Sequence, residues 1–182
     1  TGDDLVQGLG TPEDRGSRIL LTSVAAYDAW QTMAARGKSI DQQGLPYLGF
    51  GLLSSPTVNS TSVVATMMFA AGIDIHWMRP EGLRISPGEN TLLGTADDDD
   101  MVITSFFTTL VGGVGRDILK VYEGDDKLYG GLEDDKLDWS PGFDIMHGGL
   151  TGEEILTDGV DTLDYVGAGH VVIYSFAPMD SH

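Results

Sequence analysis

The chain has 182 residues, and its 28 Asp and Glu against 10 Lys and Arg give a formal net charge of −18. So acidic a protein repels nucleic-acid phosphates and anionic lipid surfaces, which argues against both as partners. Cysteine is absent, which excludes disulfides and cysteine nucleophiles, and no long apolar run predicts a membrane span.

Residues 9–93 predict a small α/β domain that contains two helices. Thr22 or Ser23 can cap a helix over residues 24–36, with Gly37 as its stop. We expect Trp30, within this helix, to fill the core.

A second helix is expected to begin near Ser60 and to end at Gly72, and its apolar residues on nearly every side predict a central position. Residues 44–53, between the two helices, predict a buried extended stretch with turns. Residues 73–93 predict a loop or short strands, because they combine two prolines with several charges.

The start of the second helix also permits an enzymatic hypothesis. Asn59, Ser60, Thr61 and Ser62 place hydroxyl groups where a helix dipole stabilises negative charge. Residues 47–73 weakly resemble the nucleophile helix of circularly permuted papain-like peptidases and amidases, and this resemblance puts Ser60 in the nucleophile's place. Serine replaces that family's cysteine, however, and no histidine precedes His76. The alternative is that Ser60 or Ser62 caps the helix, so whether the chain is an enzyme stays open.

Residues 94–165 hold most of the charge, with 18 acidic and 4 basic residues, and they are rich in glycine. Three Gly-Gly pairs begin at Gly112, Gly130 and Gly148, at a spacing of 18 residues. A fixed spacing of this kind indicates a structural repeat.

The repeat has a period of nine residues when Gly112 is counted as position one. Position eight is always aliphatic or Met, which would arise by chance roughly once in a thousand trials. These residues are Met101, Leu110, Leu119, Leu128, Leu137, Met146, Ile155 and Leu163, and only the last interval, of eight residues, breaks the period. Position six is acidic in seven of eight units: Asp99, Asp117, Asp126, Asp135, Asp144, Glu153 and Asp161, with Thr108 as the exception.

Position four is often glycine, which suggests a turn with positive φ or a close approach of two backbones. These glycines are Gly115, Gly124, Gly142 and Gly159, whereas Glu133 stands at the same position in another unit. The unit at residues 112–120 contains the whole pattern Gly-Gly-x-Gly-x-Asp-x-Leu-x.

This pattern resembles the calcium-binding nonapeptide of the RTX (repeats-in-toxin) family of secreted bacterial proteins. The resemblance implies a parallel β-roll in which two units form one coil of 18 residues. Each ion would be held between adjacent coils by aspartates two units apart and by carbonyl groups of the glycine turns. The implied pairs are Asp99 with Asp117, Asp117 with Asp135, and Asp126 with Asp144, and Glu153 and Asp161 could extend the two columns.

Physical chemistry favours the same ion. Carboxylates stacked in one column would repel each other by several kcal/mol unless a cation neutralised them. Calcium accepts six to eight oxygen ligands in flexible geometry, whereas Mg²⁺ requires a strict octahedron. We therefore expect several Ca²⁺ ions, and the resemblance implies Asp99, Asp117, Asp126, Asp135, Asp144 and Asp161 as side-chain ligands and Gly115, Gly124, Gly142 and Gly159 in the ligand turns. The acidic chain should fold only when the ions bind.

The predicted fold is therefore α+β, with a small α/β domain over 9–93, a calcium-bound β-roll over 94–165 and a C-terminal β cap over 166–182. Residues 1–8 are a possible tail of one more repeat. By resemblance the protein is secreted by a type I system or displayed on a bacterial cell surface, as a folding, adhesion or interaction module for an extracellular protein or carbohydrate. The alternative is the C-terminal part of a secreted hydrolase.

Overall fold

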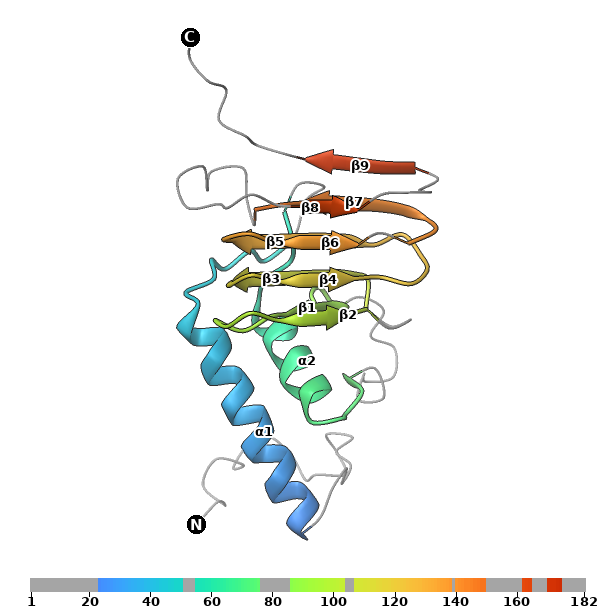
Figure 1. Ribbon diagram of the computed structural model, residues 1–182. Coiled ribbons are helices and arrows are strands. Elements are labelled where there is room, and N and C mark those ends of the chain that lie inside the picture. Colours follow the sequence, from blue (N-terminus) through green and yellow to red (C-terminus); the bar gives the residue numbers. More distant parts are fainter. Residues whose placement is uncertain are drawn as a thin grey trace.

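The computed structural model describes residues 23–50, 55–75, 86–103, 107–138, 140–149, 162–164 and 170–174. These residues form an α+β structure in which two helices lie at one end of two small parallel sheets (Figure 1). The possible repeat tail at 1–8, together with Glu153, Gly159 and Asp161, lies outside the described residues. No helix among the described residues has the length and apolar character to cross a membrane.

Helix α1 spans Ser23–Gln42, so the predicted stop at Gly37 is wrong. A Cβ at Gly37 would lie 3.1 Å from the sulfur of Met67 in α2, which indicates that glycine serves close helix packing here and does not end the helix. The chain instead leaves the helix near Gly44, whose φ of +63° is the conformation expected of a helix C-terminus.

Helix α2 spans Ser60–Ala70, close to its prediction. Its N-cap is Asn59, whose side chain accepts hydrogen bonds from the backbone N–H groups of Thr61 and Ser62. The Ser62 hydroxyl lies 2.9 Å from the Asn59 backbone nitrogen and completes a capping box. Gly72, with a φ of +72°, follows the helix as predicted.

Two expectations about the aromatic residues of this region are wrong. Trp30 does not fill the core, because 62% of its surface is exposed on α1. The stretch expected to be buried carries Tyr47 and Phe50, which are 76% and 79% exposed. Among the described residues of this stretch, Leu45 and Leu48, the latter bridging to Val58, pack against a hydrophobic cluster.

The two sheets are built by alternating strands, as a β-roll requires. The five-stranded sheet contains β1 (Thr91–Leu93), β3 (Thr109–Val114), β5 (Lys127–Leu132), β7 (Phe143–His147) and β9 (His170–Tyr174) in that order. The four-stranded sheet contains β2 (Asp100–Val102), β4 (Ile118–Lys120), β6 (Lys136–Asp138) and β8 (Thr162–Asp164). All pairs are parallel, and from β1 to β7 and from β2 to β6 each strand pairs with the strand 18 residues further along.

The position-eight side chains fill the space between the two sheets, as the sequence predicted. One hydrophobic cluster contains Met101, Leu110, Leu119, Leu128, Leu137 and Met146, all of them buried. At the end of the stack, Ala65 of α2 and Leu92 of β1 belong to the same cluster, so the helix continues the core of the roll. Strand β1 precedes Gly94, so the five-stranded sheet includes residues upstream of the repeats.

The regular period breaks after β7. Strand β8 pairs with β6 through Leu163 and Leu137, an offset of 26 residues, and β9 pairs with β7 through Ile173 and Met146, an offset of 27. The predicted C-terminal β run is thus a strand at the far edge of the five-stranded sheet, opposite the helices (Figure 1). Ile155 lies outside the described residues.

The position-four turns require positive φ, as the glycines suggested. The φ values are +112° at Gly115, +123° at Gly124 and +156° at Gly142. Glu133, at the same position, has a φ of +79° and is the one non-glycine residue with positive φ in the described part of the chain. A side chain in this region strains the backbone.

Replacing Glu133 should therefore stabilise the roll. We expect Glu133→Gly to raise the free energy of unfolding by about 1 kcal/mol relative to Glu133→Gln, because glycine adopts positive φ without a steric cost. Urea unfolding of both variants in one buffer measures this difference. The glutamine variant is the control because it removes the same charge and keeps the strained backbone. Equal stabilities would contradict the assignment of strain.

Candidate metal centre

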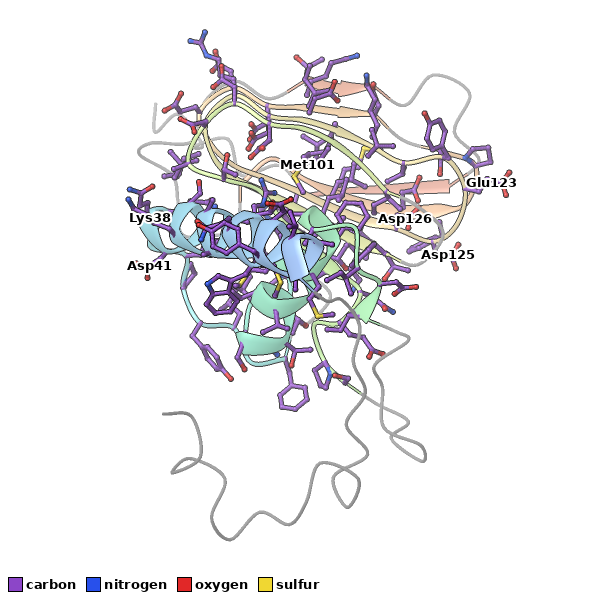
Figure 2. The ribbon with its side chains drawn as sticks, turned by 90° about the horizontal axis from the view of Figure 1, so that it is seen from below. Lys38, Asp41, Met101, Glu123, Asp125 and Asp126 are labelled. Carbon is purple, nitrogen blue, oxygen red and sulfur yellow. The ribbon has the colours of Figure 1, made fainter. Side chains whose placement is uncertain are left out.

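The aspartates of position six form two columns, one on each edge of the roll. The Asp99 column comprises Asp99, Asp117 and Asp135, in the turns that lead from the five-stranded to the four-stranded sheet. The Asp126 column comprises Asp126, in the turn that leads back to the five-stranded sheet, and Asp144, near the start of β7. Figure 2 shows Asp126, with Glu123 and Asp125, at the edge of the roll opposite to Lys38 and Asp41 of α1.

Each predicted pair of aspartates is brought together by a hydrogen bond between adjacent coils. The Asp99 N–H donates to Asp117 Oδ1 at 2.9 Å, and the Asp117 N–H donates to Asp135 Oδ1 at 2.8 Å. In the other column the Asp126 N–H donates to Asp144 Oδ1 at 3.1 Å. In each pair, Oδ1 of the later aspartate therefore accepts a hydrogen bond from the backbone of the preceding coil.

The second oxygens are the unusual feature of the site. Asp117 and Asp126 are only 1% and 2% exposed, yet their Oδ2 atoms are buried and accept no hydrogen bond from any described residue. Asp144 is fully buried, but its Oδ2 accepts a hydrogen bond from the Ser140 N–H at 3.1 Å. A buried carboxylate oxygen without a donor is costly, and it is the group that a cation would stabilise.

Burial and mutual repulsion make these carboxylates weak acids in the absence of a cation. Burial, together with the charges of Asp99, Asp98 and Glu133, raises the pKa of Asp117 to about 7, although a hydrogen bond from the Asp99 backbone opposes the shift. Burial, together with the charges of Asp144 and Asp125, raises the pKa of Asp126 to about 6. Burial also raises the pKa of Asp144, although backbone hydrogen bonds from Ser140 and Asp126 oppose the shift.

The position-one glycines make room for the carboxylates. A Cβ at Gly112 would collide with Asp117 Oδ2 and would lie 2.5 Å from the carbonyl oxygen of Gly130. A Cβ at Gly130 would meet Asp135 Oδ2 and the carbonyl oxygen of Gly148 in the same way. Carboxylate and carbonyl oxygens therefore converge at these glycines, a role that the sequence analysis did not assign to position one.

The predicted turn glycines of position four lie close to the same edges. A Cβ at Gly115 would lie 2.9 Å from the Asp97 carbonyl oxygen, and one at Gly142 would collide with the Gly124 carbonyl oxygen. A Cβ at Gly124 would lie 3.6 Å from Asp126 Oδ2. These glycines let adjacent coils approach closely around the carboxylates.

Two further aspartates belong to the columns and were missed from the sequence. Asp98 Oδ1 accepts a hydrogen bond from the Arg116 N–H at 2.9 Å, and Asp125 Oδ1 accepts one from the Phe143 N–H at 2.9 Å. Each bond joins residues 18 positions apart, as in the main columns. Asp98 and Asp125 share position five of the repeat, which is the signal that could have identified them.

The oxygen atoms that could bind a metal at this site fit a hard cation better than a soft one. Within the described residues, no three Asp, Glu or His side chains come together as a complete metal site. The side chains meet in pairs, so an ion would need carbonyl oxygens in addition to carboxylates. Such mixed oxygen ligands with flexible geometry are characteristic of Ca²⁺ sites.

The chain matches no model of a known protein family, no curated protein and no solved structure. The resemblance to RTX repeats consequently depends on the nine-residue sequence pattern alone.

The alternative site at Ser60 gains little from the structure. Ser60 is exposed at the first residue of α2, while Asn59 and Ser62 cap the helix. Among the described residues no base is hydrogen-bonded to the Ser60 hydroxyl. His76 lies outside the described residues.

The raised pKa values predict how stability depends on pH when divalent cations are removed. Folded Asp117 and Asp126 hold protons up to pKa values of about 7 and about 6, whereas the unfolded carboxyls release them near 3.8. The folded chain therefore binds more protons across this window, and the free energy of unfolding should fall as pH rises from about 4 to 7 and then level off.

Thermal melts in metal-stripped buffers measure this slope. The Asp117→Asn/Asp126→Asn double variant is the control, because removing both titrating groups should flatten the slope. Stability that rises with pH between about 5 and 7 in the parent chain would contradict the assignment.

Proposed function

We propose that the roll binds several Ca²⁺ ions between its coils and that ion binding completes its folding outside the cell. The observation that carries the proposal is the pair of buried oxygens, Asp117 Oδ2 and Asp126 Oδ2, that have no donor among the described residues. Each lies on an edge where carboxylates from adjacent coils meet, so a divalent cation would offset both the desolvation and the repulsion.

Calcium is the cation that these ligands favour. The possible metal ligands among the described residues near the columns are carboxylate and carbonyl oxygens, which are hard ligands, and the chain has no cysteine. Because carbonyl groups in turns have limited freedom to move, an ion that tolerates irregular coordination suits them better than Mg²⁺. Asp117, Asp135, Asp126 and Asp144 would hold the ions, with Asp98 and Asp125 at the outer side of each column.

If folding requires the ion, the calcium concentration determines where the protein folds. Cation sites of extracellular modules are commonly filled at 10⁻⁴ to 10⁻³ M calcium. A roll that requires such concentrations would remain incompletely folded in the cytosol and fold after secretion or at the cell surface. We propose that the folded protein then serves as an interaction or adhesion module for an extracellular protein or carbohydrate.

Calcium should change the folded content of the full chain. Far-UV circular dichroism and thermal melts, recorded with EDTA and with several millimolar CaCl₂, should show a gain in β signal and a clear rise in melting temperature with calcium. Identical spectra and melting temperatures in the two conditions would overturn the proposal. MgCl₂ at the same concentration is the control for ionic strength and should give a much smaller change.

Asp126→Asn should have opposite effects with and without calcium. In EDTA at pH 8 the variant should melt no lower than the parent chain, because it removes a carboxylate whose raised pKa corresponds to a cost of roughly 3 kcal/mol. In calcium it should melt lower, because a ligand is lost.

The matched control is Asp28→Asn, which removes one exposed charge from α1. If Asp126 had only a structural role, its replacement by Asn would lower the melting temperature both in EDTA and in calcium. A lower melting temperature in both conditions would therefore contradict its role as a ligand.

A further inference from the structure

Within the described residues no coil precedes the first coil of the roll, and the two helices lie at that end, with α2 packed against β1. Figure 1 shows α1 and α2 next to β1 and β2, at the start of the stack. The side chains of Arg36 in α1 and of Gln43, the residue after α1, make hydrogen bonds with backbone groups of the first and second coils. Thr66 of α2 accepts a hydrogen bond from the Leu93 N–H at 3.0 Å.

Asp99, the first member of its column, has a partner at each carboxylate oxygen, an ion pair at Oδ1 and hydrogen-bond donors at Oδ2. Its Oδ1 lies 3.7 Å from Nη1 of Arg36. Its Oδ2 accepts hydrogen bonds from the backbone N–H of Thr95 and from the Thr95 hydroxyl, the latter at 2.9 Å. Asp117, one coil later, receives a donor on Oδ1 alone.

The difference has a local cause in the sequence. Thr95 stands at position two of the repeat, where the next coils have Gly113 and Gly131 with φ values of +110° and +125°. Glycine at this position provides no hydroxyl group. The threonine therefore gives Asp99 Oδ2 a partner that the later coils lack.

The carbonyl groups around Asp99 also accept hydrogen bonds from Arg36 of α1 and from Gln43, which follows α1. Gln43 Nε2 donates to the Gly94 carbonyl oxygen at 2.7 Å, and Arg36 Nη2 donates to the Leu93 carbonyl oxygen at 2.6 Å. Gly94 corresponds to Gly112 and Gly130 in the frame. Gln43 reaches this edge because Gly113 has no side chain, since a Cβ there would collide with Gln43 Oε1.

We propose that the rung at Asp99 takes no calcium, and that the ions of this column begin at Asp117. Arg36, Thr95 and Gln43 occupy at the first rung the oxygens that a cation would bind at the later rungs. The helix pair and the first coil therefore form a calcium-independent unit on which the remaining coils fold. This inference rests on the proposed function, because it concerns where the calcium sites begin.

Calcium stoichiometry separates Asp99 from Asp117. Isothermal titration of the full chain with CaCl₂, supported by equilibrium dialysis, counts the ions bound at saturation. We expect Asp99→Asn to bind as many ions as the parent chain, and Asp117→Asn to bind one fewer. Asp100→Asn, which removes the exposed carboxylate next to Asp99, is the matched control and should also leave the count unchanged.

The loss of an ion in Asp99→Asn would overturn this inference while leaving the proposed function intact. A parent chain that binds no calcium would overturn the proposed function itself.

A second variant keeps the test valid if Asp99→Asn folds poorly with Arg36 left unpaired. Thr95→Gly combined with Arg36→Gln removes the Thr95 hydroxyl and the Arg36 guanidinium from the two Asp99 oxygens, leaves the backbone N–H of residue 95 in place, and introduces the glycine of the later coils. We expect this double variant to bind one ion more than the parent chain. An unchanged ion count would contradict the proposal, and a gain of one ion would support it.

Discussion

Buried carboxylates stacked at the edges of parallel strands are the constraint on which this structure depends. A β-roll repeats the same side chain at each coil, so an aspartate placed in one turn meets another aspartate one coil later. Backbone N–H groups of neighbouring coils satisfy one oxygen of Asp117, Asp135 and Asp144. The remaining Oδ2 atoms of Asp117 and Asp126 have no donor among the described residues, which is why a cation explains the site better than a surface role does.

Other features of the roll allow neighbouring coils to lie close together. Glycine at position one leaves space for a carboxylate, and glycine at position four adopts positive φ in the turns. Between the sheets the aliphatic column forms a continuous core that holds the coils in register. Helix α2 extends this core at one end through Ala65, and Arg36 of α1 and Gln43 after it donate hydrogen bonds to the first coil. In the proposed account, the fold and the ion sites therefore depend on the same repeat.

The sequence predicted the roll well because its information is periodic. Strand pairing at 18 residues, the buried column that includes Leu119 and Leu137, and the pairing of Asp117 with Asp135 all follow from the nine-residue frame. The helical region was predicted less well because tertiary contacts decide its details. Gly37 ends no helix, because it packs against Met67, and Trp30 is exposed although its residue type favours the core. The donors to Asp99 come from Arg36 and Thr95, and only the Thr95 contact is local enough to be read from spacing.

Anomalous diffraction from crystals grown in calcium tests the central claim most directly. A long-wavelength difference map would locate the cations without reference to any assumed ligand. The account predicts peaks between adjacent coils, within coordination distance of Asp117 Oδ2 and Asp126 Oδ2, on both edges of the roll. A well-ordered roll at millimolar calcium with no peak beside either oxygen would contradict it.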